Sequence, residues 1–477
     1  MTASIKMRAH VTGAVLAAFV LRLYFVCRFP FYDAGDTPIY QQLAHNWLRH
    51  GIYGLEIFGR VTPIDIRTPG YPAFLASIYT VFGENARAVM VMQAFVGVLT
   101  CVLVAAMAAV LAPKESRRRV ALAALWLAAL CPFTANYTAV VLTETLTIFL
   151  SALALLVLME ALRGLRRTRG FVGLFVSSTE TSSHMQWLMG GIVVGFGTLV
   201  RPETPLILAA GGAVLLAVWW RPKNWAKLLQ AGILLGIGLI LPLLPWAARN
   251  LRVLHKVQFL APRYSELPGE FTPHGFYAWT GTWLWRFRDV YLVSWNLDGA
   301  KIPIEDISPS AFDSPGERER VATLLTAYNE TTDMTPEIDR GFAEIARERT
   351  ARHPLRTYFT VPLLRAFSMW FTPRVEMLPL SGHLWPVAYW WEDSKPQYCI
   401  SLGLFVLGIA YGVMALGGAW RTRTDPVALL LVAYIVIRTA FLTTVETPEP
   451  RYVLECFPAV LALAAQLWVK RNALTAQ

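Results

Sequence analysis

The sequence predicts an all-α polytopic membrane protein with about ten to eleven transmembrane helices. The chain has 477 residues, of which 55% are hydrophobic and only 16% are charged, whereas about 25% of the residues in a soluble domain are charged. The apolar residues also gather in runs that approach or reach the ~20 residues needed to cross a bilayer. These spans are predicted to be helical because an open sheet cannot satisfy its backbone hydrogen bonds in lipid.

Ten apolar runs are candidate spans. The longer ones cover residues 11–26, 88–111, 139–159, 228–246 and 399–419, and the shorter ones cover 120–135, 185–200, 205–220, 427–442 and 453–469. Lys6 and Arg8 precede the first run as in a signal peptide, but no small-residue cleavage site follows, so a retained span is predicted.

The topology follows from the basic residues, which gather in short loops at every second crossing. They lie within residues 114–119, 163–169, 221–227, 421–423 and 470–471. By the positive-inside rule these loops and both termini are cytoplasmic. The net charge of +11 is therefore read as a topology signal and as contact with membrane lipids, and no nucleic-acid partner is predicted.

Three regions are predicted along the chain. Residues 1–250 form an N-terminal membrane module whose first outer loop covers about 28–85, residues 251–395 form a long outer-face loop with interfacial helices, and residues 396–477 form the C-terminal transmembrane helices. Within the long loop, residues 316–328 and 337–352 are expected to be helical. Residues 357–371 are apolar but short and contain Arg365, and the parity of the basic loops favours an interfacial or re-entrant helix there.

The first outer loop carries two carboxylates, Asp33 and Asp36. Asp36 is a good N-cap for an amphipathic helix over residues 37–50, which Gly51 would end. A second helix is expected over residues 71–82. Asp36 is therefore either a simple helix cap or a catalytic acid, and the cap does not explain Asp33.

Glu144 is predicted to lie one to two turns inside a span, counted from its outer end. An ionisable residue at that depth is a functional-site hypothesis by default. The alternative is a structural partner for Arg22 or Arg438, which lie in the outer halves of their own predicted spans.

Three arginines stand where predicted spans meet the outer surface: Arg201, Arg249 beside Asn250, and Arg451 beside Tyr452. Guanidinium groups bind phosphate bidentately and stay charged. One such arginine alone is more often a side chain that snorkels to the headgroups. Three at one depth predict an anionic lipid ligand.

Metal and disulfide chemistry are not indicated. No cluster of His, Asp or Glu has metal-ligand spacing, so no cofactor is predicted, although a divalent metal is possible. The five cysteines include no CxxC pair and are interpreted as packing residues.

The outer-face motifs together resemble a known family. They are Asp36 followed by Tyr40, Arg67-Thr68-Pro69-Gly70-Tyr71-Pro72, Thr143-Glu144, Arg201-Pro202-Glu203, Pro245-Trp246-Ala247-Ala248-Arg249-Asn250, and Glu449-Pro450-Arg451-Tyr452. In this order they resemble the bacterial branch of the C-type glycosyltransferase superfamily. That branch is similar to protein O-mannosyltransferases and to the lipid A aminoarabinose transferase.

The resemblance implies an enzyme of the bacterial inner membrane that takes a sugar from a polyprenyl-phosphate carrier. The sugar would pass to a glycan, lipid or protein acceptor at the periplasmic face, usually with inversion. The first-loop acid of such enzymes is the catalytic base, which corresponds to Asp36. This chain has Asp36-Thr37 where an Asp-Glu pair is usual, so Asp33 stays open as the working acid.

The remaining candidate site residues take supporting roles. Tyr40, Arg67, Tyr71 and Glu144 would shape the cavity, and some of Arg201, Arg249 and Arg451 would hold the carrier phosphate.

Three other functions compete with a transferase. A lipid-linked saccharide flippase or transporter would favour broken helices, charges near the bilayer midplane and two related halves. An envelope polysaccharide polymerase would carry essential arginines in two large outer loops, and only one long loop is present here. A non-catalytic scaffold would explain the spans but not the placement of carboxylates and arginines.

Overall fold

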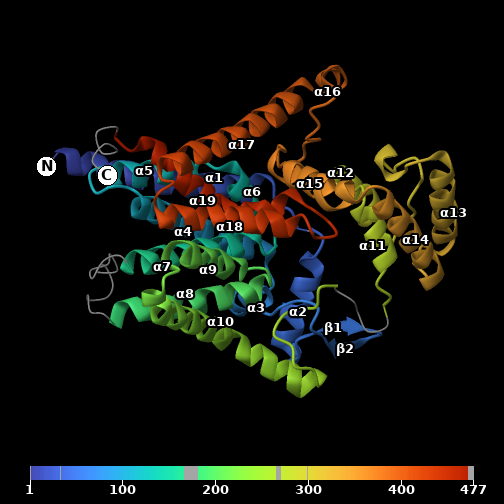
Figure 1. The fold of residues 1–477 in the computed structure, drawn as a ribbon, viewed down its shortest axis with the longest axis horizontal. Helices are drawn as coiled ribbons and strands as arrows, with labels where there is room; N and C mark the ends of the chain where they lie inside the picture. Colours follow the sequence, from blue (N-terminus) through green and yellow to red (C-terminus); the bar gives the residue numbers. More distant parts are fainter. Residues whose placement is uncertain (1, 33, 166–180, 265–269, 298, 471–477) are drawn as a thin grey trace. The chain divides into compact units, whose positions relative to one another are not determined.

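A computed structural model describes residues 2–32, 34–165, 181–264, 270–297 and 299–470, and it is 73% helical, as predicted (Figure 1). The chain divides into two units. The first comprises Met1–Arg263, Arg374–Ile437 and Leu454–Gln477, and the second comprises Tyr264–Pro373 and Arg438–Val453.

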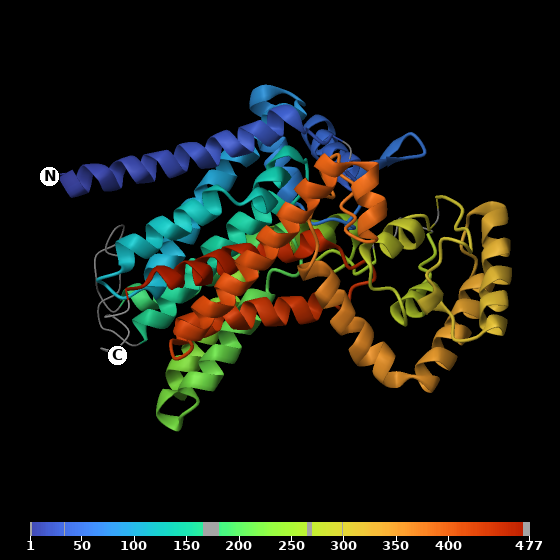
Figure 2. The same cartoon turned by 90° about the horizontal axis from the view of Figure 1, so that it is seen from above.

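The first unit is a bundle of apolar helices. Its helical elements are α1 (Thr2–Arg28), α4 (Ala86–Leu111), α5 (Arg117–Ala129), α6 (Pro132–Asn136), η1 (Tyr137–Ala139), α7 (Glu144–Gly164), α8 (Thr181–Val200), α9 (Leu206–Trp219), the short polar η3 (Pro222–Asn224), α10 (Trp225–Leu254), α16 (Val387–Asp393), α17 (Lys395–Arg421), α19 (Phe457–Ala464) and most of α18 (Pro426–Leu442), whose residues from Arg438 onward belong to the second unit. α8 packs against α10, and α4 packs against both α5 and α7. In Figure 2 the long α1 is seen at the edge of this bundle.

Five helices of the described residues are long and apolar enough to cross a membrane: α1, α4, α7, α10 and α17. A sixth span results if α5 and residues 132–139, which meet at a bend of 51°, are counted as one. α3, α9, α18 and residues 184–200 of α8 are apolar but shorter. The polytopic class is confirmed, and the count of ten to eleven spans stays a prediction.

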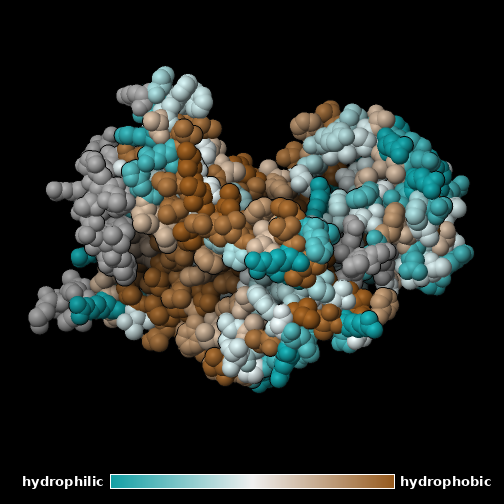
Figure 3. Space-filling model, turned by 90° about the horizontal axis from the view of Figure 1, so that it is seen from below, coloured by the Kyte–Doolittle hydropathy of each residue, from teal (hydrophilic) through white to brown (hydrophobic). Residues whose placement is uncertain are grey.

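The outward side chains of these helices are apolar, as lipid contact requires. On α10, Leu229, Ile237 and Leu244 are exposed, and Figure 3 shows a broad apolar surface on one face of the molecule. Contiguous apolar surface of this kind marks contact with a membrane or with another protein.

Two predicted spans differ from their observed helices. The run over residues 139–159 enters an α-helix only at Glu144, because residues 140–143 are not helical. The run over residues 453–469 is split into 3₁₀-helix Pro450–Cys456, α19 and 3₁₀-helix Ala465–Trp468. Residues 453–466 are all buried, so other helices surround this segment.

The first outer loop contains α2 (Thr37–His50), the strands β1 (Gly54–Ile57) and β2 (Arg60–Pro63), and α3 (Gly70–Phe82). The helix predicted over residues 37–50 is confirmed with the same bounds, and it ends where Gly51 adopts a φ of +67°. The antiparallel hairpin of β1 and β2 was not predicted.

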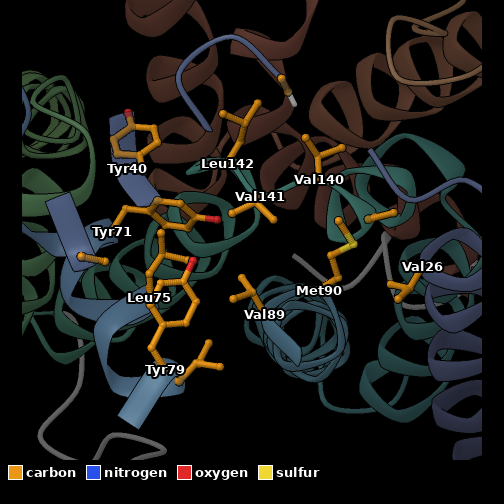
Figure 4. Close-up of a cluster of buried hydrophobic side chains, with 14 of the residues drawn as sticks. Val26, Tyr40, Tyr71, Leu75, Tyr79, Val89, Met90, Val140, Val141 and Leu142 are labelled. Carbon is orange, nitrogen blue, oxygen red and sulfur yellow. The ribbon is translucent and has the colours of Figure 1, made fainter. Parts of the chain in front are cut away.

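α3 begins against the end of α8. A Cβ at Gly70 would lie 2.5 Å from the carbonyl oxygen of Leu199, so only glycine fits there. Aromatic and aliphatic side chains fill the space beyond this contact, and Figure 4 shows Tyr40, Tyr71, Leu75, Val89 and Val140 among them.

The second unit is a small helical fold with its own core. It contains α11 (His274–Gly281), α12 (Phe287–Asp289), π-helix η4 (Val290–Ser294), 3₁₀-helix η5 (Pro309–Ala311), α13 (Pro315–Thr331), α14 (Pro336–Arg352), π-helix η6 (Arg356–Thr360) and α15 (Val361–Trp370). Trp279 and Trp283 are fully buried in this core with Phe342. These two tryptophans therefore pack a protein interior, whereas Tyr291 and Trp295 are exposed.

Two polar contacts stabilise the second unit. Asp339 accepts hydrogen bonds from the backbone N–H groups of Gly275 and Phe276 at 2.9 and 2.8 Å, at the start of α11. The fully buried Arg349 pairs with Glu317 and, at 3.2 Å, with Asp313.

Asp313 also receives two hydrogen bonds from Arg356, at 2.6 and 3.1 Å. Burial alone would raise the pKa of Asp313. The hydrogen bonds from Arg356 and the charges of Arg349 and Arg352 outweigh this and lower the pKa below its ordinary value.

Candidate active site

Asp36 stands directly before α2 but does not cap it through its side chain. Its Oδ1 instead accepts a hydrogen bond from Nη2 of Arg67 at 2.8 Å. The Asp36 side chain is 37% exposed and that of Arg67 is 19% exposed. The interpretation of Asp36 as a simple helix cap is therefore wrong, and its carboxylate is accessible from solvent.

Arg67 is held in place by its own loop. Its Nη1 donates to the carbonyl oxygen of Ile66 at 2.9 Å, and its own carbonyl oxygen accepts from the Tyr53 hydroxyl at 2.9 Å. Burial would lower the pKa of Arg67, but the charge and hydrogen bond of Asp36 raise it above its ordinary value. The guanidinium is thus a fixed positive charge beside the carboxylate.

Tyr40 lies one helical turn after Asp36 and is buried. Its ring meets that of Tyr71 edge to face, with centroids 5.2 Å apart. Burial, and then the charge of Asp36, raise the pKa of the Tyr40 hydroxyl well above its ordinary value, while Arg67 and Arg201 oppose this rise. The Tyr40 hydroxyl is therefore held in its neutral form.

Gln93 is a site residue that the motif analysis missed. It is fully buried on α4 and accepts a hydrogen bond from the Tyr71 hydroxyl at 2.8 Å. Its Nε2 donates to the carbonyl oxygens of Thr138 at 3.2 Å and Val140 at 2.7 Å. In the sequence, a single glutamine within the apolar run over residues 88–111 could have indicated a buried polar role for this residue.

The segment that Gln93 holds leads directly into Glu144. Within this segment, the carbonyl oxygen of Val141 accepts a hydrogen bond from the Thr37 hydroxyl at 3.0 Å. The N–H of Phe31 donates to the carbonyl oxygen of Ala139 at 2.9 Å. The segment after α1, together with α2 and α4, thus positions the start of α7.

Glu144 is the first residue of α7 and is fully buried. The prediction that it lies one to two turns inside a span is wrong for this helix, because residues 140–143 before it are not helical. Its partner is Arg201, whose Nη2 lies 2.8 Å from Oε1. Arg22 donates instead to the carbonyl oxygen of Ala18.

Arg201 joins four side chains from distant parts of the chain. Its Nε donates to the Thr143 hydroxyl at 2.9 Å, and its Nη1 lies 3.1 Å from Glu455 and 3.6 Å from Glu203. Glu455, like Glu144, is 1% exposed, and Arg201 is 11% exposed. We call Arg201, Glu144, Glu203 and Glu455 the Arg201 cluster.

Arg249 lies near the end of α10 and fastens the first outer loop to it. It donates to the carbonyl oxygens of Tyr53 at 2.5 Å and Ile64 at 2.8 Å, and to Asn250 at 2.9 Å. Its guanidinium also stacks on the rings of Tyr53 and Trp246. Asn250 in turn donates to the carbonyl oxygen of Gln258.

Arg451 and Tyr452 belong to the second unit and meet at Glu449. Nε of Arg451 lies 2.6 Å from Glu449, and the Tyr452 hydroxyl donates to the same carboxylate at 2.8 Å.

The structure thus brings together Asp36, Arg67, Tyr40 and Tyr71, and it joins Glu144 to Arg201. Asp33 lies outside the described residues. Within the part of the chain that the structure describes, no three His, Cys, Asp or Glu side chains are grouped to hold a metal ion.

No family model and no curated protein matches this sequence. The chain is similar to the oligosaccharyltransferase AglB of Archaeoglobus fulgidus in complex with an inhibitory peptide and a dolichol-phosphate. The TM-score is 0.50 at 14% identity, over 97% of this chain and 50% of that one. A structure of the Archaeoglobus fulgidus oligosaccharyltransferase tethered to an acceptor peptide gives 0.50 at 13% identity, over 96% and 49%.

The chain is also similar to ArnT of Cupriavidus metallidurans bound to undecaprenyl phosphate, with a TM-score of 0.39 at 12% identity, over 97% of this chain and 78% of that one. The likeness to AglB confirms the predicted fold. This chain spans about half the length of that oligosaccharyltransferase.

Proposed function

We propose that this protein is a membrane glycosyltransferase that moves a sugar from a polyprenyl-phosphate carrier to an acceptor at the outer face of the membrane. The observation that carries the proposal is the Asp36 carboxylate, which Arg67 orients at 2.8 Å while it stays 37% exposed. A general base must be both positioned and accessible to its substrate. The C-type fold supports the class of reaction.

In the proposed reaction, Asp36 takes the proton of an acceptor hydroxyl as that oxygen attacks the anomeric carbon. The bond between the anomeric carbon and the phosphate oxygen breaks, and its electron pair leaves with the polyprenyl phosphate. A phosphate is a good leaving group, so no general acid is needed. A base of this kind contributes about 10²–10⁴-fold to the rate.

Arg67 is our candidate for stabilising the departing phosphate. Arg201 and Arg249 already hold glutamates and backbone carbonyls, whereas Arg67 lies beside the base itself. A guanidinium fork can bridge a carboxylate and a phosphate, and fixed charge at the leaving group lowers the barrier. Tyr40 would shape the same site, backed by Tyr71.

The carrier and its side of the membrane follow from separate observations. AglB was solved with a dolichol-phosphate, which supports a polyprenyl-phosphate carrier here. The basic loops predict that Asp36 faces outward, which is the periplasm if the membrane is a bacterial inner membrane. The acceptor is a glycan, a lipid or a protein.

The test is sugar transfer from a set of polyprenyl-phosphate sugars by purified wild type, Asp36→Asn and Asp33→Asn. Asp65→Asn is the matched control, because this carboxylate lies in the same loop, 3.9 Å from Lys256. We expect Asp36→Asn to lose about 10²–10⁴-fold in turnover while it still binds the carrier. The control should keep its rate.

Two outcomes would contradict this assignment. Loss in Asp33→Asn alone would move the base to the other carboxylate. A wild type that binds and translocates the carrier lipid, but transfers no sugar, would replace the transferase by the flippase.

A further inference from the structure

One helix of the second unit exposes a continuous apolar face. It consists of six large side chains, each 45–70% exposed, at helical spacing along η6 and α15: Leu355, Tyr358, Phe359, Leu363, Phe367 and Phe371. We call this surface the α15 face. Exposed apolar patches of this size mark sites of contact with a membrane or with another protein.

The opposite side of α15 packs into the second unit. Val361 and Met369 are buried there, and Arg365 lies between them. The Arg365 guanidinium donates to the carbonyl oxygens of Leu284 at 2.8 Å and of Thr443 and Val445 at 3.0 Å each. The one charged residue of α15 is therefore turned inward, and the α15 face carries no charge.

α15 also contacts residues 439–442, the last turn of α18, which belongs to the second unit. Trp370 donates from Nε1 to the Thr439 hydroxyl at 3.0 Å, and Met369 packs with Leu442. α18 is an apolar helix whose Phe441 is exposed near its end. The buried side of α15 is thus packed against the last turn of an apolar helix, within the second unit.

We propose that the α15 face lies in the lipid bilayer, at the headgroup level of the outer leaflet, and docks the second unit on the membrane. The uncharged face and its aromatic side chains fit that level. The fifteen residues of η6 and α15 extend about 23 Å, which is short of the ~30 Å hydrocarbon core. The helix therefore lies along the interface and does not cross. This inference does not depend on the proposed transfer reaction.

The test uses the full chain in nanodiscs of phosphatidylethanolamine and phosphatidylglycerol. Cys27 and Cys399, the exposed cysteines of the described residues, are replaced by serine. Bimane is then attached to Leu363→Cys or, as the matched control on exposed α14, to Arg347→Cys. We expect brominated lipids to quench most of the fluorescence at 363 and iodide to quench little, with the opposite result at 347.

Two results would overturn the proposal. Iodide could quench the label at 363 as fully as at 347, which would place the α15 face in water. A label shielded from iodide but insensitive to brominated lipid would show that protein covers the face. Phe367→Cys, labelled in the same way, provides a second reporter, and each labelled variant must keep the wild-type melting temperature.

Discussion

Replacing Arg201 by methionine separates two roles for this residue. The sequence predicts that Arg201 binds the carrier phosphate at the membrane surface. In the structure Arg201 instead forms ion pairs with Glu144 and Glu455, each 1% exposed. Methionine keeps most of the side-chain volume and removes the cation that these buried carboxylates share. Breaking one buried ion pair costs about 3–5 kcal/mol, so we expect a marked loss of stability.

The loss can be followed through the protein's own thiols. Cys101, Cys131 and Cys456 are buried, and they become reactive when the bundle unfolds, so a thiol-reactive dye reports the melting temperature in detergent. Arg201→Met should melt well below wild type, and Arg201→Lys should lie between them because it keeps the charge but loses the fork. An unchanged melting temperature with a raised KM for the lipid-linked donor would refute this reasoning and restore the phosphate-binding role.

Three further predictions concern other parts of the molecule. Arg249→Met should increase trypsin cleavage within residues 54–63, because the loop loses its hydrogen bonds to α10. Gly275→Ala should lower the melting temperature, since its Cβ would lie 2.0 Å from a carbonyl oxygen and such overpacking costs about 1–3 kcal/mol; Gly281→Ala, with nothing within 4 Å, is the control. The lowered pKa of Asp313 contributes stability above its unfolded value of about 3.9. That contribution should vanish as the pH falls through the folded pKa, and Asp313→Asn should abolish this dependence in acid denaturation curves.

The sequence predicted α2 to the residue because its signals are local. Pro38 near the start and Gly51 at the end define the helix without reference to the rest of the fold. The apolar runs likewise identify α1, α4 and α10, since lipid selects for hydrophobicity directly. Helices of this kind can be predicted from a single sequence.

The predictions that were wrong concern side chains whose partners lie far away in the sequence. Glu144 was predicted inside a span because nothing local shows that residues 140–143 are not helical, at the point where Gln93 of α4 donates to the carbonyl oxygen of Val140. The partner of Arg201 at Glu455 lies 254 residues further along the chain. The sequence around Asp36 is typical of a helix cap, whereas in the structure its carboxylate accepts a hydrogen bond from Arg67. Sequence reasoning found these residue types and missed their pairing.

Gln93 has a consequence for how mutational scans of this protein are read. One amide side chain satisfies two buried carbonyls and a tyrosine hydroxyl. Any replacement leaves several polar groups in an apolar interior without partners, and each costs about 1–3 kcal/mol. In a screen scored by product alone, Gln93 would rank with the reacting carboxylate although it touches no substrate. Scoring the amount of folded protein in parallel would distinguish a residue that builds the site from one that reacts in it.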